Sequence, residues 1–172
     1  LSKLHSSDKK VYISGYLGHV FCVQVLREVF QNSVFIHLER NILDNVSSIL
    51  RVSSDGNFSL QPKNLEGFKG SREERVVRQV LTIQSLILDN EADDTIRIHY
   101  EDLCNNPLDK IKEIRKLAAK HGITMNLSED ILIPEKFKVS KVDKNSDEHK
   151  RVYEIIQSEI TTFCQEKRNY FE

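Results

Sequence analysis

The chain has 172 residues, 39% of them hydrophobic and 30% charged, which suits a single domain with a packed core. Its 25 Lys and Arg residues nearly balance its 26 Asp and Glu residues, so the formal net charge is -1. This balance argues against a general nucleic-acid-binding protein and against a long disordered tail. No apolar run approaches the roughly 20 residues of a membrane-spanning helix, so we expect a soluble segment that does not insert into a membrane.

Three cysteines, Cys22, Cys104 and Cys164, are widely separated and odd in number. They show no CxxC or Cys/His spacing of the kind that a zinc site needs. We therefore expect reduced thiols and no bound metal.

The first part of the chain predicts two strand-to-helix units. A short β-prone stretch at residues 11–13 is followed by an apolar-periodic helix that continues to Phe30. Residues 33–38 are rich in β-branched and aromatic side chains, which predicts a strand covered on both faces, as in a parallel sheet. Residues 41–52 then carry apolar side chains at helical spacing.

The second part alternates in the same way. Residues 53–70 are rich in Ser, Asn, Gly and Lys, which predicts an exposed loop that helps to select an acceptor or acts as a lid. Four further elements are expected. A helix extends from the capping box of Ser71 and Glu74 to about Asn90, and a strand follows at 95–99. Asn106 caps and Pro107 begins the next helix, which ends at His121 and Gly122, and a final helix covers 147–171.

Strands that alternate with helices predict an α/β fold with a parallel sheet flanked by helices. Only three strands are recognisable, fewer than the roughly five or six of a typical sheet. We therefore expect that part of the sheet is missing from the chain.

Arg40 lies at the carboxyl end of the strand predicted at 33–38, and Ser48 follows two helical turns later. Ligands of open α/β sheets bind beyond the carboxyl ends of the strands, and an arginine beside a helix N-terminus suits a phosphate. The alternative is that Arg40 pairs with a nearby carboxylate and Ser48 only lies on a helix face.

Two segments resemble the sulfotransferase family. Residues 34–48, VFIHLERNILDNVSS, resemble the strand of that family that ends in Arg-Asp/Asn-Pro and is followed by Asp and Ser, although Ile42 replaces the proline. Residues 96–103, IRIHYEDL, followed by Asn106 and Pro107, are similar to its Tyr-Glu-Asp-Leu strand end and the next helix start. The resemblance covers most of the chain from Val11 to Phe171 and implies the P-loop nucleotide-hydrolase-like fold of sulfotransferases.

The resemblance also implies a donor, 3′-phosphoadenosine 5′-phosphosulfate (PAPS). Arg40 and Ser48 would bind its 3′-phosphate, and Tyr100 would lie near its adenine. A guanidinium, a hydroxyl and an aromatic ring are suited to these groups.

The chain departs from the family at its start. Residues 1–10 do not supply the Lys-Ser-Gly-Thr-like loop that holds the 5′-phosphosulfate in such enzymes. We expect a single sulfotransferase-like domain over residues 1–172 that lacks its first strand-loop-helix unit, and a segment that is inactive on its own.

Transfer to a hydroxyl needs a group that accepts its proton. His19 is the best-placed candidate for the catalytic base, although residues 14–16 do not reproduce the Lys-Thr-His-like run of related enzymes. An ordinary loop or helix-cap histidine is the alternative. His37 and His99 lie inside predicted strands, where we expect them to be packed.

Two further features suit an anion. Residues 67–72 place glycines and Lys69 before a helix start, although a solvated loop with an ordinary cap is the commoner arrangement. Four lysines near the C-terminal third form a basic face toward an acceptor or simply a solvated face: Lys136, Lys138, Lys141 and Lys144.

The sequence thus predicts a sulfotransferase that moves a sulfuryl group from PAPS to a hydroxyl or amine, with carbohydrates among the candidate acceptors and no metal. The expected partners are PAPS or its product 3′-phosphoadenosine 5′-phosphate (PAP) and the acceptor, without nucleic acid or membrane insertion. The expected location is cytoplasmic, or the Golgi lumen if an N-terminal anchor precedes the segment. The alternative is an inactive remnant that binds a nucleotide or a protein.

Overall fold

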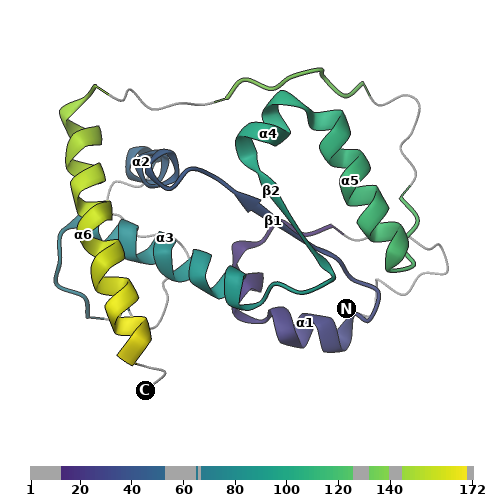
Figure 1. Cartoon of the computed structure of the whole chain (residues 1–172), viewed down its shortest axis with the longest axis horizontal. Coiled ribbons are helices and arrows are strands. Elements are labelled where there is room, and N and C mark those ends of the chain that lie inside the picture. Colours follow the sequence, from purple (N-terminus) through teal and green to yellow (C-terminus); the bar gives the residue numbers. More distant parts are fainter. Residues whose placement is uncertain (1–12, 53–64, 66, 126–131, 140–144, 170–172) are drawn as a thin grey trace.

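The computed structural model describes residues 13–52, 65, 67–125, 132–139 and 145–169, and the side chains of these residues up to Phe163. Figure 1 shows a mixed α/β arrangement in which two strands cross the middle of the fold and helices lie on either side. The N-terminal part contains the 3-10 helix η2 (Leu17–Phe21), α1 (Val23–Val29), β1 (Phe35–Glu39) and α2 (Ile42–Val52). The remainder contains α3 (Arg72–Asp89), β2 (Thr95–His99), α4 (Tyr100–Asn105), α5 (Pro107–Lys120) and α6 (Asp147–Asn169).

Local signals place several helix boundaries. Ser71 Oγ accepts a hydrogen bond from the Glu74 backbone N–H, and the Glu74 carboxylate accepts one from the Ser71 N–H, so the predicted capping box begins α3. Pro107 occupies the first turn of α5, but Asn106 makes no side-chain cap, so the expected cap is wrong while the helix start is right. Gly122, with a φ of 73°, ends α5 in the left-handed conformation that glycine adopts without strain.

The hydrophobic core lies between α2, α3 and α6. Apolar side chains at helical spacing on the three helices meet there, and α6 packs on both of the others (Figure 1). Because each buried Val or Leu side chain contributes about 1.5–3 kcal/mol, this cluster is the main source of stability in the described fold. Its buried members are Val46, Leu50, Val76, Val77, Val80, Val152 and Ile156.

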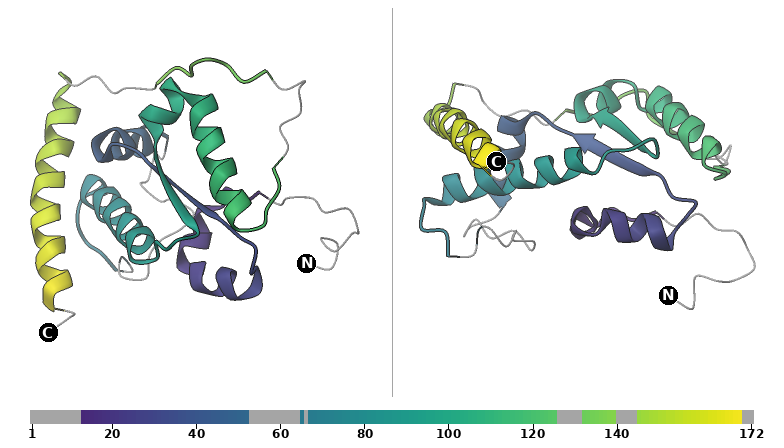
Figure 2. Two further views of the ribbon diagram at one scale, coloured as in Figure 1. Left: turned by 45° about the vertical axis from the view of Figure 1, so that its right-hand side comes forward. Right: turned by 60° about the horizontal axis from the view of Figure 1, so that its bottom comes forward.

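The sheet of the described residues has two parallel strands, β1 and β2, in the register Phe35↔Thr95 to Glu39↔His99. Figure 2 shows α4 and α5 on one side of these strands and α1 and α3 on the other. The expectation of a strand covered on both faces is wrong for β1, because Ile36 and Leu38 are 47% and 48% exposed. On β2, Ile98 is buried, since α4 and α5 contact β2.

Only the last residue of the first predicted strand, at 11–13, is among the described residues. Val11 and Tyr12 lie outside the described residues, and Ile13 is exposed in irregular structure. Most of the predicted loop at 53–70 also lies outside them.

Candidate functional site

The two strands end side by side, and the residues that follow them form the candidate site. Arg40 comes directly after β1, and Tyr100 begins α4 directly after β2. The Arg40 guanidinium carbon lies 5.0 Å from the centre of the Tyr100 ring. This is a cation–π distance, so the structure brings together two of the residues that the sequence singled out. Tyr100 and the two acids after it form the first turn of a helix, and not the end of a strand as the sequence suggested.

Ser48 lies on α2, the helix that follows Arg40. Asn41 begins this helix, since its Oδ1 accepts hydrogen bonds from the backbone N–H groups of Leu43 at 3.0 Å and Asp44 at 3.3 Å. Ser48 is half-buried six positions after the first residue of the helix, which corresponds to about 9 Å along its axis. A ligand phosphate that contacts both Arg40 and Ser48 would therefore lie along the first two turns of α2.

His19 lies on η2, which contacts α1 and α3. Its ring is in edge-to-face contact with Tyr16, with ring centres 5.4 Å apart. The structure therefore groups His19 with α1 and α3, and neither of these helices carries Arg40, Ser48 or Tyr100.

A pair that the sequence did not indicate lies at the same strand ends. Glu39 and His99 are register partners, and Glu39 Oε2 lies 3.4 Å from His99 Nδ1. The His99 side chain is 59% exposed, so the expectation that it is packed is wrong. The reason is that a two-stranded sheet leaves this end of β2 open. Finding the pair from sequence would require the strand register, which local patterns do not contain.

The sulfotransferase family model matches residues 3–125, which include both strands and all of the site residues named above. The chain belongs to the sulfotransferase family. No curated protein and no solved structure matches it. Within this family the donor carries a sulfonate group, so the carboxyl edge of the sheet is the natural place to look for anion contacts.

Other parts of the sulfotransferase-family chain serve structure. In the glycine-containing turn before α3, the Glu74 carboxylate accepts a hydrogen bond from the Ser71 N–H at 2.6 Å, so this N–H is not available to an anion. This contact holds the pKa of Glu74 below its ordinary value. The turn is thus an ordinary helix cap, which was the alternative to an anion loop. The exposed Lys136 and Lys138 lie in the described segment 132–139, whereas Lys141 and Lys144 lie outside the described residues.

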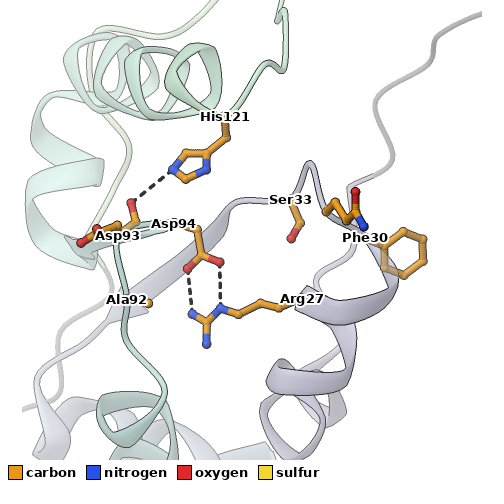
Figure 3. A pocket seen from close by; sticks show the side chains of 8 residues that line it. Arg27, Phe30, Ser33, Ala92, Asp93, Asp94 and His121 are labelled. Carbon is orange, nitrogen blue, oxygen red and sulfur yellow. Dashed lines mark hydrogen bonds and ion pairs between the residues drawn. The ribbon is translucent and has the colours of Figure 1, made fainter.

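The opposite, amino edge of the sheet contains a shallow hollow of about 520 Å³ (Figure 3). Arg27 crosses it and binds Asp94 through two hydrogen bonds of 2.7 Å, while His121 Nε2 lies 3.3 Å from the Asp93 carbonyl oxygen. Through these hydrogen bonds the Asp94 carboxylate raises the pKa of Arg27, and the Arg27 guanidinium lowers the pKa of Asp94. The arginine is thus engaged by protein groups, and its ion pair across the hollow joins α1 to the start of β2.

A polar cluster in which only His37 is buried lies on the same face of the sheet as Glu39 and His99. His37 Nδ1 is 2.8 Å from Glu91 Oε1, and Arg97 donates to the same carboxylate from Nε at 3.0 Å and from Nη2 at 2.5 Å. The hydrogen bonds from Arg97 and then from His37 hold the pKa of Glu91 below its ordinary value. As expected from its place in a strand, His37 is packed.

Among the described residues, no group of three or more His, Cys, Asp or Glu side chains is arranged to hold a metal ion. Within the same part of the chain, no helix has the length and apolar character to cross a membrane.

Proposed function

We propose that this chain uses PAPS as its sulfuryl donor and that Arg40, Ser48 and Tyr100 bind the nucleotide. The single observation that carries this proposal is the stacking of Arg40 on Tyr100 at the carboxyl edge of the sheet, in a chain of the sulfotransferase family. The segment 1–172 would then form one sulfotransferase-like domain.

The stacked arrangement fits the donor chemically. A guanidinium that stacks through its face still donates hydrogen bonds from its edge, in the plane where a phosphate binds in a bidentate manner. The Tyr100 ring offers a flat apolar surface to adenine. The Ser48 hydroxyl would add a neutral donor to the same 3′-phosphate from α2.

The acceptor in this proposal is a hydroxyl or an amine, with carbohydrates among the candidates. The acceptor atom attacks sulfur in line with the bond that breaks, and PAP is the other product. The carboxyl edge is open to solvent on the β1 side, where Leu38 is about half exposed, so an acceptor of considerable size could approach it.

Isothermal titration calorimetry of PAP with the natural full-length protein tests the donor site. Arg40→Ala should weaken PAP binding by about 10-fold or more, because a charge-assisted hydrogen bond contributes about 1.5–3 kcal/mol. Adenosine 5′-phosphate, which lacks the 3′-phosphate, should bind the wild type and the variant with similar affinity. Arg115→Ala is the matched control, because Arg115 is exposed on α5, away from the site.

Absence of PAP binding by the wild-type protein would contradict the proposal. The alternative of an inactive remnant that binds a protein partner would then account for the family membership. Equal loss of PAP and adenosine 5′-phosphate binding in Arg40→Ala would contradict the assignment of Arg40 to the 3′-phosphate.

A further inference from the structure

The carboxyl edge of the sheet carries a second side-chain pair that donor binding does not use. Glu39 ends β1 and His99 ends β2, and the register places them opposite each other. Glu39 Oε2 lies 3.4 Å from His99 Nδ1, and 59% of the His99 side chain is exposed, against 32% for Glu39. The imidazole thus has a carboxylate beside its Nδ1 atom, and more than half of the side chain faces solvent.

Among the described histidines, only His99 combines an exposed ring with a carboxylate partner at the carboxyl edge. His37 also has a carboxylate partner, but its side chain is only 5% exposed, so an acceptor cannot reach it. The other described histidines lie on η2, at the amino edge and in the buried start of α6: His19, His121 and His149.

The placement of His99 relative to the proposed donor contacts suits an acid–base role. Glu39 and His99 are register partners and share one face of the sheet, while Arg40 follows the end of β1 and Tyr100 begins α4, each one residue later in the chain. A donor whose 3′-phosphate and adenine contact Arg40 and Tyr100 carries its reactive sulfur on the 5′ side of the ribose, away from the 3′-phosphate. A base that acts on the acceptor must lie near this sulfur, and so it must also be offset from the 3′-phosphate contact.

We propose that His99 is the general base of the transfer and that Glu39 is its positioning residue; this inference rests on the proposed function. In this structure Glu39 Oε2 lies 3.4 Å from His99 Nδ1 without a hydrogen bond, and in the substrate complex the carboxylate moves close enough to accept the Nδ1–H, which leaves the lone pair on Nε2. Nε2 takes the proton of the acceptor O–H or N–H as the acceptor atom bonds to sulfur. The bond between sulfur and the 5′-phosphate oxygen breaks, and its electron pair leaves with PAP. His99 thereby takes the role that the sequence suggested for His19.

The test compares sulfuryl transfer with donor binding in the natural full-length protein. Transfer is measured with ³⁵S-labelled PAPS and a set of phenols and sugars as acceptor probes, and donor binding is measured by calorimetry with PAP. His99→Gln should lower kcat about 100-fold or more, the usual contribution of a general base, while PAP affinity stays within about twofold. Glu39→Gln should lower kcat by less, because it disturbs only the orientation of the ring.

Chemical rescue separates a base from a merely structural residue. His99→Ala should regain part of its rate when imidazole is added to the solution, because free imidazole can occupy the space and accept the proton. His121→Gln is the matched control, since His121 lies at the amino edge of the sheet, and its rate should stay unchanged. Circular dichroism on every variant checks that the fold is retained, as expected for an exposed side chain.

Four outcomes would overturn the inference. Two concern the variants' rates: full transfer by His99→Gln, or transfer lost in His19→Gln but kept in His99→Gln. The others are a loss of PAP affinity in His99→Gln that matches its loss of rate, and PAP binding by the wild type without transfer to any probe. Absence of PAP binding in the wild-type protein is a different result, because it contradicts the proposed function itself.

Discussion

Arg27 binds Asp94 with both Nε and Nη2, each 2.7 Å from a carboxylate oxygen, and so joins α1 to the start of β2. The same Nη2 donates to the Asn90 carbonyl oxygen at 2.7 Å and to Thr95 Oγ1 at 3.2 Å. The guanidinium also lies over the Phe35 ring at 5.0 Å. One side chain thus connects α1, the end of α3 and the first residues of both strands, which fixes the amino edge while the carboxyl edge stays open.

Arg27→Met should lower the free energy of unfolding by about 1–3 kcal/mol, because it leaves the Asp94 carboxylate largely buried without its charged donor. Both side chains are only 17% exposed, so solvent screens the pair weakly. Urea unfolding monitored by circular dichroism measures the change. Lys150→Ala, which removes an exposed ion pair with Asp147, is the control and should change stability by less than about 0.5 kcal/mol. An equal effect of the two substitutions would contradict the role of Arg27.

Stability should fall as the pH is lowered below about 4.5, because carboxyl groups of the folded state have depressed pKa values. Hydrogen bonds from Arg27 lower the pKa of Asp94 below 3.8, and those from Arg97 and His37 lower that of Glu91 below 4.5. The unfolded chain therefore binds protons first, so this stabilisation is complete above the ordinary pKa values and is lost as the pH falls through the folded ones. Urea unfolding at a series of pH values between 7 and 3 measures the slope. Asp94→Asn should reduce it, and an unchanged slope would show that the Arg27 contact does not contribute.

Ile156→Ala should lower the free energy of unfolding by about 2–5 kcal/mol, because it leaves a cavity among α2, α3 and α6. Ile156 is 1% exposed and lies beyond residue 125, where the family match ends. Thermal and urea unfolding measure the loss. Val52→Ala is the control, because Val52 is 81% exposed and should change stability by less than about 0.5 kcal/mol. If Ile156→Ala were as mild as the control, α6 would not form part of the core.

Tyr100→Ala should weaken PAP binding by about 5- to 150-fold, because the stacking of a base on an aromatic ring is worth about 1–3 kcal/mol. Tyr100→Phe keeps the ring that Arg40 and the adenine contact, so its affinity should stay within about threefold of the wild type. Calorimetry with PAP gives both values. A loss in Tyr100→Phe as large as that in Tyr100→Ala would assign the contribution to the hydroxyl and contradict a stacking role.

The sequence by itself predicted the elements whose signals are local. The capping residues Ser71 and Glu74, the first-turn Pro107 and the apolar spacing of α2 and α6 each act within a few residues, so they indicate helices without knowledge of the rest of the chain. The two strand-end motifs around Arg40 and Tyr100 likewise pointed to the sulfotransferase family, which the family match confirms.

Only the tertiary structure decided which of these residues meet. The pairing of β1 with β2 joins segments 60 residues apart, and its register places Glu39 against His99 and brings Arg40 to Tyr100. The exposure of Leu38 and His99 has the same origin, because burial depends on which helices cover a strand and not on the residues within it. Strand register is set by long-range packing, so the candidate donor contacts could be predicted one motif at a time, whereas the proposed base could be recognised only once the fold had placed the two strands together.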